Sequence, residues 1–243
     1  MPFLGYVTSV LSRFTINPAK KHLNAAIRVL IYLRSHPVTG LKLGGLNSSC
    51  KFRVWVDASW TDHWSVTGAL FCLGHTLVNW FTRRQTRVSR SSMEAETFAA
   101  ADAATEGSFE MDLISELDVP QATMQILCDS QSTLDFTANQ FSCKRSKAFV
   151  RDTHFLRDWV ARLLCQFRKV LGTKNHADTM TKPLAVGPFT IHFNAMVHAQ
   201  MIPPVESTSV PSQYSFLSIS GLPFRVTDSL TGMSGSVPSP AME

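Results

Sequence analysis

Short apolar stretches at the strand period open the central part of the chain. In "FRVWVDASW", residues 52 to 60, the side chains alternate between two faces, and Asp57 stands near the end of the run. Two further apolar stretches follow, and the tight Gly74-His75 connection between them predicts a β-hairpin. The pattern therefore predicts three consecutive strands, over residues 52–59, 67–74 and 76–84.

A helical period takes over after the hairpin. Small and apolar residues recur every three to four positions, and Ser91 and Glu94 have the spacing of a capping box. This predicts one long helix over residues 91–118, with a stripe small enough to lie close on a sheet. The stripe consists of Met93, Thr97, Ala100, Ala104, Gly107, Met111 and Ile114.

The rest of the central region alternates between the two periods. The predicted elements are a strand at 122–130, a short helix at 130–140, a longer helix at 146–165, a strand at 166–172 and a last helical turn at 175–182. A hairpin followed by alternating helices and strands is typical of a mixed sheet. We therefore expect an α/β fold.

Both ends of the chain differ from this central domain, residues 49–185. The leading segment, residues 1–48, contains an amphipathic helix predicted over 17–35 with Asn17 as its N-cap. The apolar stripe of this helix consists of Leu23, Ala26, Ile27, Leu30 and Leu33. Beyond the central domain, Ser, Pro and Gly accumulate without a sustained period, which predicts a flexible tail over residues 186–243.

Composition narrows the class of protein only slightly. The 243 residues include five cysteines without a C-x-x-C pair, which argues against a disulfide framework or a cysteine zinc site. No run of about 18 uncharged apolar residues predicts a membrane span, and the N-terminus lacks the pattern of a secretion signal. The net charge is +5, and two basic clusters, residues 82–90 and 143–147, suit either a phosphate backbone or a solvated loop.

Four acidic residues stand where the predicted elements begin or end. Asp57 ends the first strand, Glu96 lies in the first turns of the long helix, Asp129 closes the fourth strand and Asp178 opens the last helical turn. If the first and fourth strands are neighbours, their acids lie close together, and like charges this close require a cation to remain ionised. Oxygen ligands without histidine or cysteine favour Mg²⁺ or Mn²⁺, and two such ions are the usual device for phosphodiester chemistry.

Each acid also has an ordinary structural explanation when it is taken alone. Glu96 suits the positive end of a helix dipole, and Asp129 and Asp178 could each cap the helical segment that follows. The spacing alone leaves both explanations open.

Five motifs in a fixed order carry a resemblance to a known family. They are "VWVDASW", "SVTGALFCLG", "VNWFTRRQTRVSRSSMEAETFAAADAATEG", "ILCDSQSTLDF" and "HADTMTKPL". Over residues 10–184 the chain resembles the ribonuclease H region of copia-type LTR-retrotransposon polyproteins, and "LSRFTINPAKKHLNAAIRVLIYLRS" resembles the segment that precedes it, after reverse transcriptase. No Asp-Asp pair occurs, so the polymerase signature of that family is absent from this chain.

The resemblance implies a fold, a site and a reaction. The fold is a ribonuclease H-like mixed five-stranded sheet with helices on both faces. The family's metal ligands fall on Asp57, Glu96, Asp129 and Asp178, where Glu96 rather than Glu94 matches the register of the catalytic helix. These ligands would hold two Mg²⁺ or Mn²⁺ ions. The reaction would be hydrolysis of the RNA strand of an RNA–DNA hybrid, and the protein would recognise the hybrid by its groove and 2′-hydroxyls.

Further residues are candidates for contact with this substrate or for an accessory role. The substrate-binding candidates are Arg83, Arg84, Arg87, Arg90, Ser130 and Gln131. The four arginines are equally well explained as a solvated hairpin end. His176, two residues before Asp178, is either an accessory group at the last acid or an incidental loop histidine.

Departures from the family pattern keep a second function open. The loop "TDHWSVTG" is short and lacks the family's cations, Ser59 replaces an aspartate, and Ala148 and Val150 stand where histidine and aspartate are usual. The first hypothesis is a metal-dependent ribonuclease H, and the alternative is a degenerate remnant that binds nucleic acid without cleaving it. The expected partners are an RNA–DNA hybrid and a reverse-transcriptase domain supplied elsewhere. The expected location of the chain is the cytoplasm or the nucleus, and no membrane is expected as a partner.

Overall fold

The computed structural model describes most of the chain up to residue 203. The described ranges are 1–36, 40–44, 50–61, 64–119, 121, 123–138 and 150–203. The helical elements are η1 (Pro2–Leu4), α1 (Gly5–Ser12), α2 (Lys20–Ser35), α3 (Ser92–Glu116), α4 (Gln131–Ala138), α5 (Val150–Ala161), η2 (Gly172–Lys174), α6 (Asp178–Thr181) and α7 (Val186–Val197). The strands are β1 (Phe52–Trp60), β2 (Ser65–Leu73), β3 (Thr76–Arg84), β4 (Met124–Cys128) and β5 (Cys165–Lys169).

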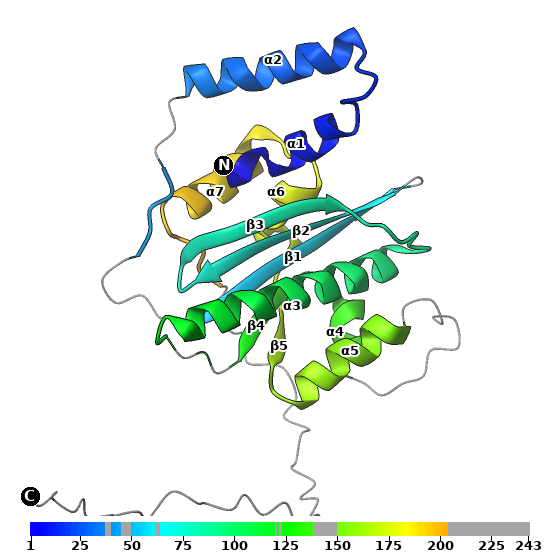
Figure 1. The fold of residues 1–243 in the computed structure, drawn as a ribbon, viewed down its shortest axis with the longest axis vertical. Coiled ribbons are helices and arrows are strands. Elements are labelled where there is room, and N and C mark those ends of the chain that lie inside the picture. Colours follow the sequence, from blue (N-terminus) through cyan, green and yellow to red (C-terminus); the bar gives the residue numbers. More distant parts are fainter. Residues whose placement is uncertain are drawn as a thin grey trace, which may run out of the picture. The chain divides into compact units, whose positions relative to one another are not determined.

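The five strands form one mixed sheet in the order β3-β2-β1-β4-β5. The first three strands are antiparallel, whereas β4 and β5 run parallel to β1. The predicted hairpin is present, and Gly74 in its turn has a φ of 64°, a conformation that favours glycine. Helices cover both faces of the sheet (Figure 1). The expected ribonuclease H-like architecture is thus confirmed.

The alternation in β1 divides the core into two layers, one on each face of the sheet. Phe52, Val54 and Val56 belong to the cluster on the α3 face, whereas Trp55 belongs to the cluster on the opposite face. This is the division that the strand period predicts. Asp57 has the same parity as Trp55, so it lies on the face opposite α3.

The α3 face is built from small residues. Five of the seven predicted stripe positions of α3 are buried: Thr97, Ala100, Ala104, Gly107 and Ile114. A Cβ atom built on Gly107 would lie 2.4 Å from Met124 Sδ, so the missing side chain allows α3 to approach β4 closely. α5 packs beside α3 on the same side.

The opposite face is covered by short elements, and one of them corrects the sequence prediction. The prediction assigned residues 186–243 to a tail, but Val186–Val197 forms α7, and its Met196 is fully buried in the second cluster. Glycine, proline and β-branched residues give "VGPFTIHFNAMV" a low helix propensity, so tertiary packing decides its conformation. Residues 204–243 lie outside the described residues.

The N-terminal helix begins later than the sequence predicts. α2 starts at Lys20, and its N-cap is Ala19 rather than Asn17, because the His22 Nδ1 atom accepts a hydrogen bond from the Ala19 N–H at 3.0 Å. Leu23 and Leu30 of the predicted stripe are 59% and 64% exposed. Nothing in the described part of the chain covers this stripe fully.

One predicted helix ends earlier in the structure than the sequence indicates. The helix predicted over 146–165 is described only from Val150 and ends at Ala161, because Leu163 adopts a positive φ of 58° and Cys165 already begins β5. Leu163 itself is exposed. The start of this predicted helix, and the basic cluster at 143–147, lie outside the described residues.

No helix among the described residues is long and apolar enough to span a bilayer.

Candidate metal centre

The pairing of β1 with β4 brings two of the predicted acids together. Trp55 and Leu127 are partners in the parallel register, and Asp57 and Asp129 each follow two residues later. Equivalent positions on neighbouring parallel strands lie side by side at the same edge of a sheet. Asp57, near the carboxyl end of β1, therefore stands beside Asp129, which directly follows β4.

A close approach of α6 to β2 adds the third acid. Gly68 is the antiparallel partner of Asp57, and a Cβ atom at Gly68 would lie 2.4 Å from Met180 Cβ and 2.8 Å from Thr181 Cγ2. Only glycine lets α6 lie this close to the strand without a displacement. Asp178, the first residue of α6, thereby comes to the same edge of the sheet.

Three carboxylates converge at this edge. One oxygen each of Asp57, Asp129 and Asp178 lie within 4.8 Å of one another. Glu96, from the first turns of α3, lies close enough to Asp57 and Asp129 for both charges to raise its pKa, and its Oε2 atom is buried without a hydrogen-bond partner. Three of the four predicted acids thus converge from separate segments, and Glu96 lies nearby without belonging to the group within 4.8 Å.

The competing explanations for these acids are resolved by their neighbours. The Ser91 hydroxyl accepts from the Glu94 N–H and Glu94 Oε2 accepts from the Arg90 N–H, so Glu94 rather than Glu96 serves the start of α3. The Ser130 hydroxyl accepts from the Thr133 N–H at 3.3 Å and so caps α4, in place of Asp129. The cap of α6 is Ala177, not Asp178.

Burial and nearby negative charge raise the pKa of Asp57, Glu96 and Asp178. Asp57 is 2% exposed, and burial raises its pKa from 3.8 to about 7; Asp178 and Asp129 add to the rise, whereas Lys182 and the Thr181 hydroxyl oppose it. Burial also raises the pKa of Glu96 and of Asp178. A cation at this edge would favour the ionised forms of these carboxylates.

Three residues beside the acids were missed by sequence reasoning. The Lys182 ammonium lies 2.9 Å from Asp178 Oδ1 and 3.7 Å from Asp57 Oδ2, and the Thr181 hydroxyl donates to Asp57. The amide of Asn175, which is fully buried, donates to the Val56 carbonyl at 3.0 Å and lies 3.5 Å from Asp129 Oδ1. The spacing of Thr181 and Lys182, three and four residues after Asp178, was a usable signal.

The donor set fits a hard divalent cation. Every converging ligand atom is a carboxylate oxygen, which Mg²⁺ and Mn²⁺ prefer, and Glu96 Oε2 still lacks a partner. The residues that would hold such an ion are Asp57, Asp129 and Asp178, with Glu96 at their side.

The predicted substrate-binding arginines have different surroundings. Arg83 forms a 3.0 Å ion pair with Glu106, and Arg87 pairs with Asp152 and lies 3.8 Å from Asp102. These pairs reduce the positive charge available for phosphates. Arg84 instead lies over the Trp64 ring, and Arg90 is exposed.

The remaining predicted site residues are Ser130, Gln131 and His176. Ser130 is engaged in capping α4, and the exposed Gln131 donates to Asp135. The His176 ring packs edge-on against Trp55 with a centroid distance of 4.5 Å, and its Nδ1 atom is 2.9 Å from Nδ1 of His192 in α7. Burial lowers the pKa of His176 to about 4, and His192 contributes to the lowering. An accessory role for His176 stays a prediction.

Comparison with known proteins identifies relatives. The chain is 30% identical over 208 residues to the retrovirus-related Pol polyprotein from transposon RE1 of Arabidopsis thaliana, and 31% identical over 208 residues to that from transposon RE2. Each alignment covers 84% of this chain and 14% of the polyprotein, so the chain spans about a seventh of the length of these relatives. No protein-family model matches the chain.

A solved structure with a similar fold is the N-terminal RNase H domain of a Mycobacterium tuberculosis protein. It is 12% identical, with a TM-score of 0.42 over 60% of this chain and 99% of that chain. The chain belongs, by its sequence, to the retrovirus-related Pol polyproteins of copia-type transposons.

Proposed function

We propose that this chain is a ribonuclease H that hydrolyses the RNA strand of RNA–DNA hybrids with divalent metal ions. The observation that carries the proposal is the convergence of Asp57, Asp129 and Asp178 within 4.8 Å, from two neighbouring strands and a short helix. Glu96 is the fourth ligand of the proposed site. Four acids from distant segments would be a costly arrangement if no cation were bound.

The proposed chemistry divides between the metal and the protein. Two Mg²⁺ or Mn²⁺ ions would supply a nucleophilic water and stabilise charge at the departing oxygen. The chain's own residues would hold the carboxylates in place: Thr181 through its bond to Asp57, and Asn175 through its bonds to the Val56 carbonyl of β1 and to the Ala177 N–H before α6. Substrate choice would depend on the shape of the hybrid and its 2′-hydroxyls.

The alternative is a remnant that keeps the fold and binds nucleic acid without cleaving it. One observation favours this alternative: the Lys182 ammonium lies between Asp57 and Asp178, where it neutralises charge that a metal ion would otherwise neutralise. Lys182 is part of the "ADTMTKPL" stretch that resembles the family motif, and therefore we rank the enzyme first.

Cleavage of a labelled RNA–DNA hybrid tests the proposal. The wild-type chain should cleave the RNA strand with Mg²⁺ and not with EDTA, and Asp129→Asn should abolish cleavage. Asp112→Asn is the matched control, because Asp112 is an exposed acid of α3 and its substitution changes the charge equally. Hybrid binding without Mg²⁺-dependent cleavage by the wild type would favour the remnant.

A further inference from the structure

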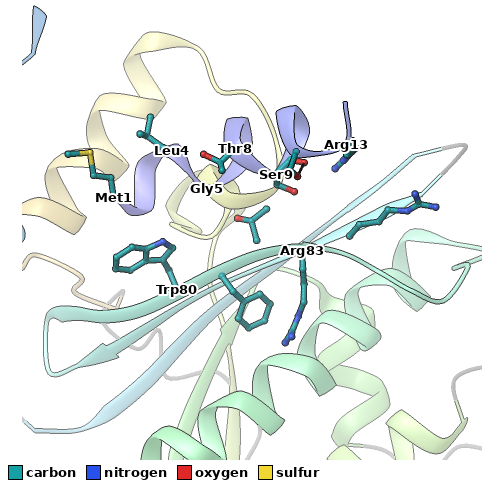
Figure 2. A pocket seen from close by; sticks show the side chains of 12 residues that line it. Met1, Leu4, Gly5, Thr8, Ser9, Arg13, Trp80 and Arg83 are labelled. Carbon is teal, nitrogen blue, oxygen red and sulfur yellow. Dashed lines mark hydrogen bonds between the residues drawn. The ribbon is translucent and has the colours of Figure 1, made fainter. Parts of the chain in front are cut away.

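A groove lies between α1 and β3, the outermost strand of the sheet (Figure 2). Its volume is about 820 Å³. The α1 side presents the hydroxyls of Thr8, Ser9 and Ser12, and the β3 side presents Trp80 and Thr82. None of the lining residues is an aspartate or a glutamate. The groove is therefore free of carboxylates, with hydroxyls beside the apolar Met1 and Leu4 on one wall and an aromatic ring on the other.

Two arginines at one end of this groove each lie over the ring of Trp64. The guanidinium carbons of Arg13 and Arg84 each lie 5.1 Å from the centroid of the Trp64 ring. Side chains alternate along β3, so Arg84 shares the face of Trp80 and Thr82, whereas Arg83 turns to the α3 side, where it pairs with Glu106 (Figure 2).

Within the part of the chain that the structure describes, no carboxylate pairs with the positive charge at this end of the groove. Among the described residues neither Arg13 nor Arg84 forms an ion pair, and the Nε and Nη2 atoms of Arg13 are buried without a hydrogen-bond partner. Buried guanidinium nitrogens that lack an acceptor are costly. Arg13, with these unpartnered nitrogens, and Arg84, over the same ring, are the kind of groups that bind an anion, and guanidinium groups suit phosphate in particular.

The groove shares a wall with the helix that carries the last acid. Thr82 Oγ1, in the groove, lies 3.4 Å from Met180 Sδ of α6. A Cβ atom on Gly5 would lie 2.9 Å from each of these two atoms, so α1 also packs directly on this contact. A strand in the groove would thus pass beside α6, which holds Asp178.

We propose that this groove binds the phosphodiester backbone of a nucleic-acid strand, with Arg13 and Arg84 on the phosphates and the α1 hydroxyls along the backbone. The inference rests on the proposed nucleic-acid function and adds a second contact surface outside the acidic edge. Arg13 lies outside the predicted central domain, so the leading segment contributes to substrate binding.

Binding of a fluorescent RNA–DNA hybrid in EDTA, where no cleavage occurs, tests the groove. The double variant Arg13→Gln/Arg84→Gln should weaken binding by about tenfold per arginine in 0.1 M salt and lower the slope of log K against log salt by about 2. The matched control is Arg28→Gln/Arg34→Gln, which removes the same charge from the exposed face of α2 and should change binding little. Equal affinities of the two double variants would overturn the inference.

A second measurement uses the unaltered protein and a hybrid that contains 5-bromouracil. The hybrid carries the label in one strand at a time. Photo-cross-links at Trp64 or Trp80 are expected with at least one of the two labelled strands, because at least one strand enters the groove. Cross-links confined to residues outside the groove would contradict the proposal. Mg²⁺-dependent cleavage that persists in such a case would leave the ribonuclease proposal standing, so the two failures are distinguishable.

Discussion

The two faces of the sheet are built on different principles. The α3 face is a continuous layer of alanine, glycine and aliphatic side chains under one helix of 25 residues. The opposite face is assembled from α1, α6, α7 and loops, and its buried groups include Asn175, His176, Thr181 and His192. Apolar packing dominates the first face, where Thr97 is one of few buried polar groups, whereas the second face buries several polar side chains.

The difference explains where the acidic edge lies. Asp57 and Asp178 belong to the second face, whose short elements can place polar atoms individually, whereas the long helix contributes only Glu96 from its first turns. We infer that the α3 face supplies stability and the α6 face supplies chemistry. Substitutions and solution conditions that act on one face alone can test this division.

The largest expected effect is on the pH dependence of stability without metal. The pKa of Asp57 in the folded protein, about 7, exceeds its ordinary value of 3.8, so the folded state binds more protons than the unfolded state between these values. Stability should therefore fall as the pH rises from 4 to 7, by up to about 4 kcal/mol from Asp57 alone. Glu96 and Asp178, whose pKa values are also raised, act in the same direction.

Urea unfolding in EDTA at several pH values measures the slope of the free energy of unfolding against pH. Asp57→Asn should flatten it, Asp112→Asn should leave it unchanged, and Mg²⁺ should restore stability at high pH by binding only the folded state. Stability that rises with pH between 4 and 7 would contradict the raised pKa values.

The next effect contrasts one glycine on each face. Gly68→Ala places a methyl group against Met180 Cβ and Thr181, next to the backbone of α6, and should cost about 1–3 kcal/mol and weaken Mg²⁺ binding. Gly107→Ala meets the flexible thioether of Met124 and gains helix propensity of about 1 kcal/mol, so its net cost should be small.

Thermal unfolding and Mg²⁺ titration of both variants make the comparison. If Gly107→Ala lost as much Mg²⁺ affinity as Gly68→Ala, the division of labour between the faces would be wrong.

The sequence predicted the α3 face almost completely. Its strand alternation and its helical stripe follow from periods that burial on one side enforces, so they are visible without tertiary information. Asp57 and Asp129 could be brought together once β1 and β4 were taken as neighbours, because both end their strands. The selection of Glu96 over Glu94 depended on family resemblance, not on periodicity.

The α6 face could not be predicted in the same way. α7 has low helix propensity and forms because residues such as Met196 are buried, a tertiary effect. The contact between Gly68 and Met180 joins residues 112 positions apart by sequence number, and no local pattern announces it. Arg13 and Arg84 likewise reach the same ring, that of Trp64, only through the fold.

The smallest expected effect concerns Lys182. Its ammonium is 41% exposed and lies beside Asp57 and Asp178, so it repels a divalent cation bound there, although solvent screens part of this repulsion. Lys182→Gln should therefore raise the apparent Mg²⁺ affinity by about threefold to tenfold, measured by calorimetric titration. Lys174→Gln, at an exposed position in η2, is the control and should leave the affinity unchanged. A lower affinity of Lys182→Gln would mean that the ammonium holds Asp178 in place for the ion, and that the α6 face is as firmly organised as the α3 face.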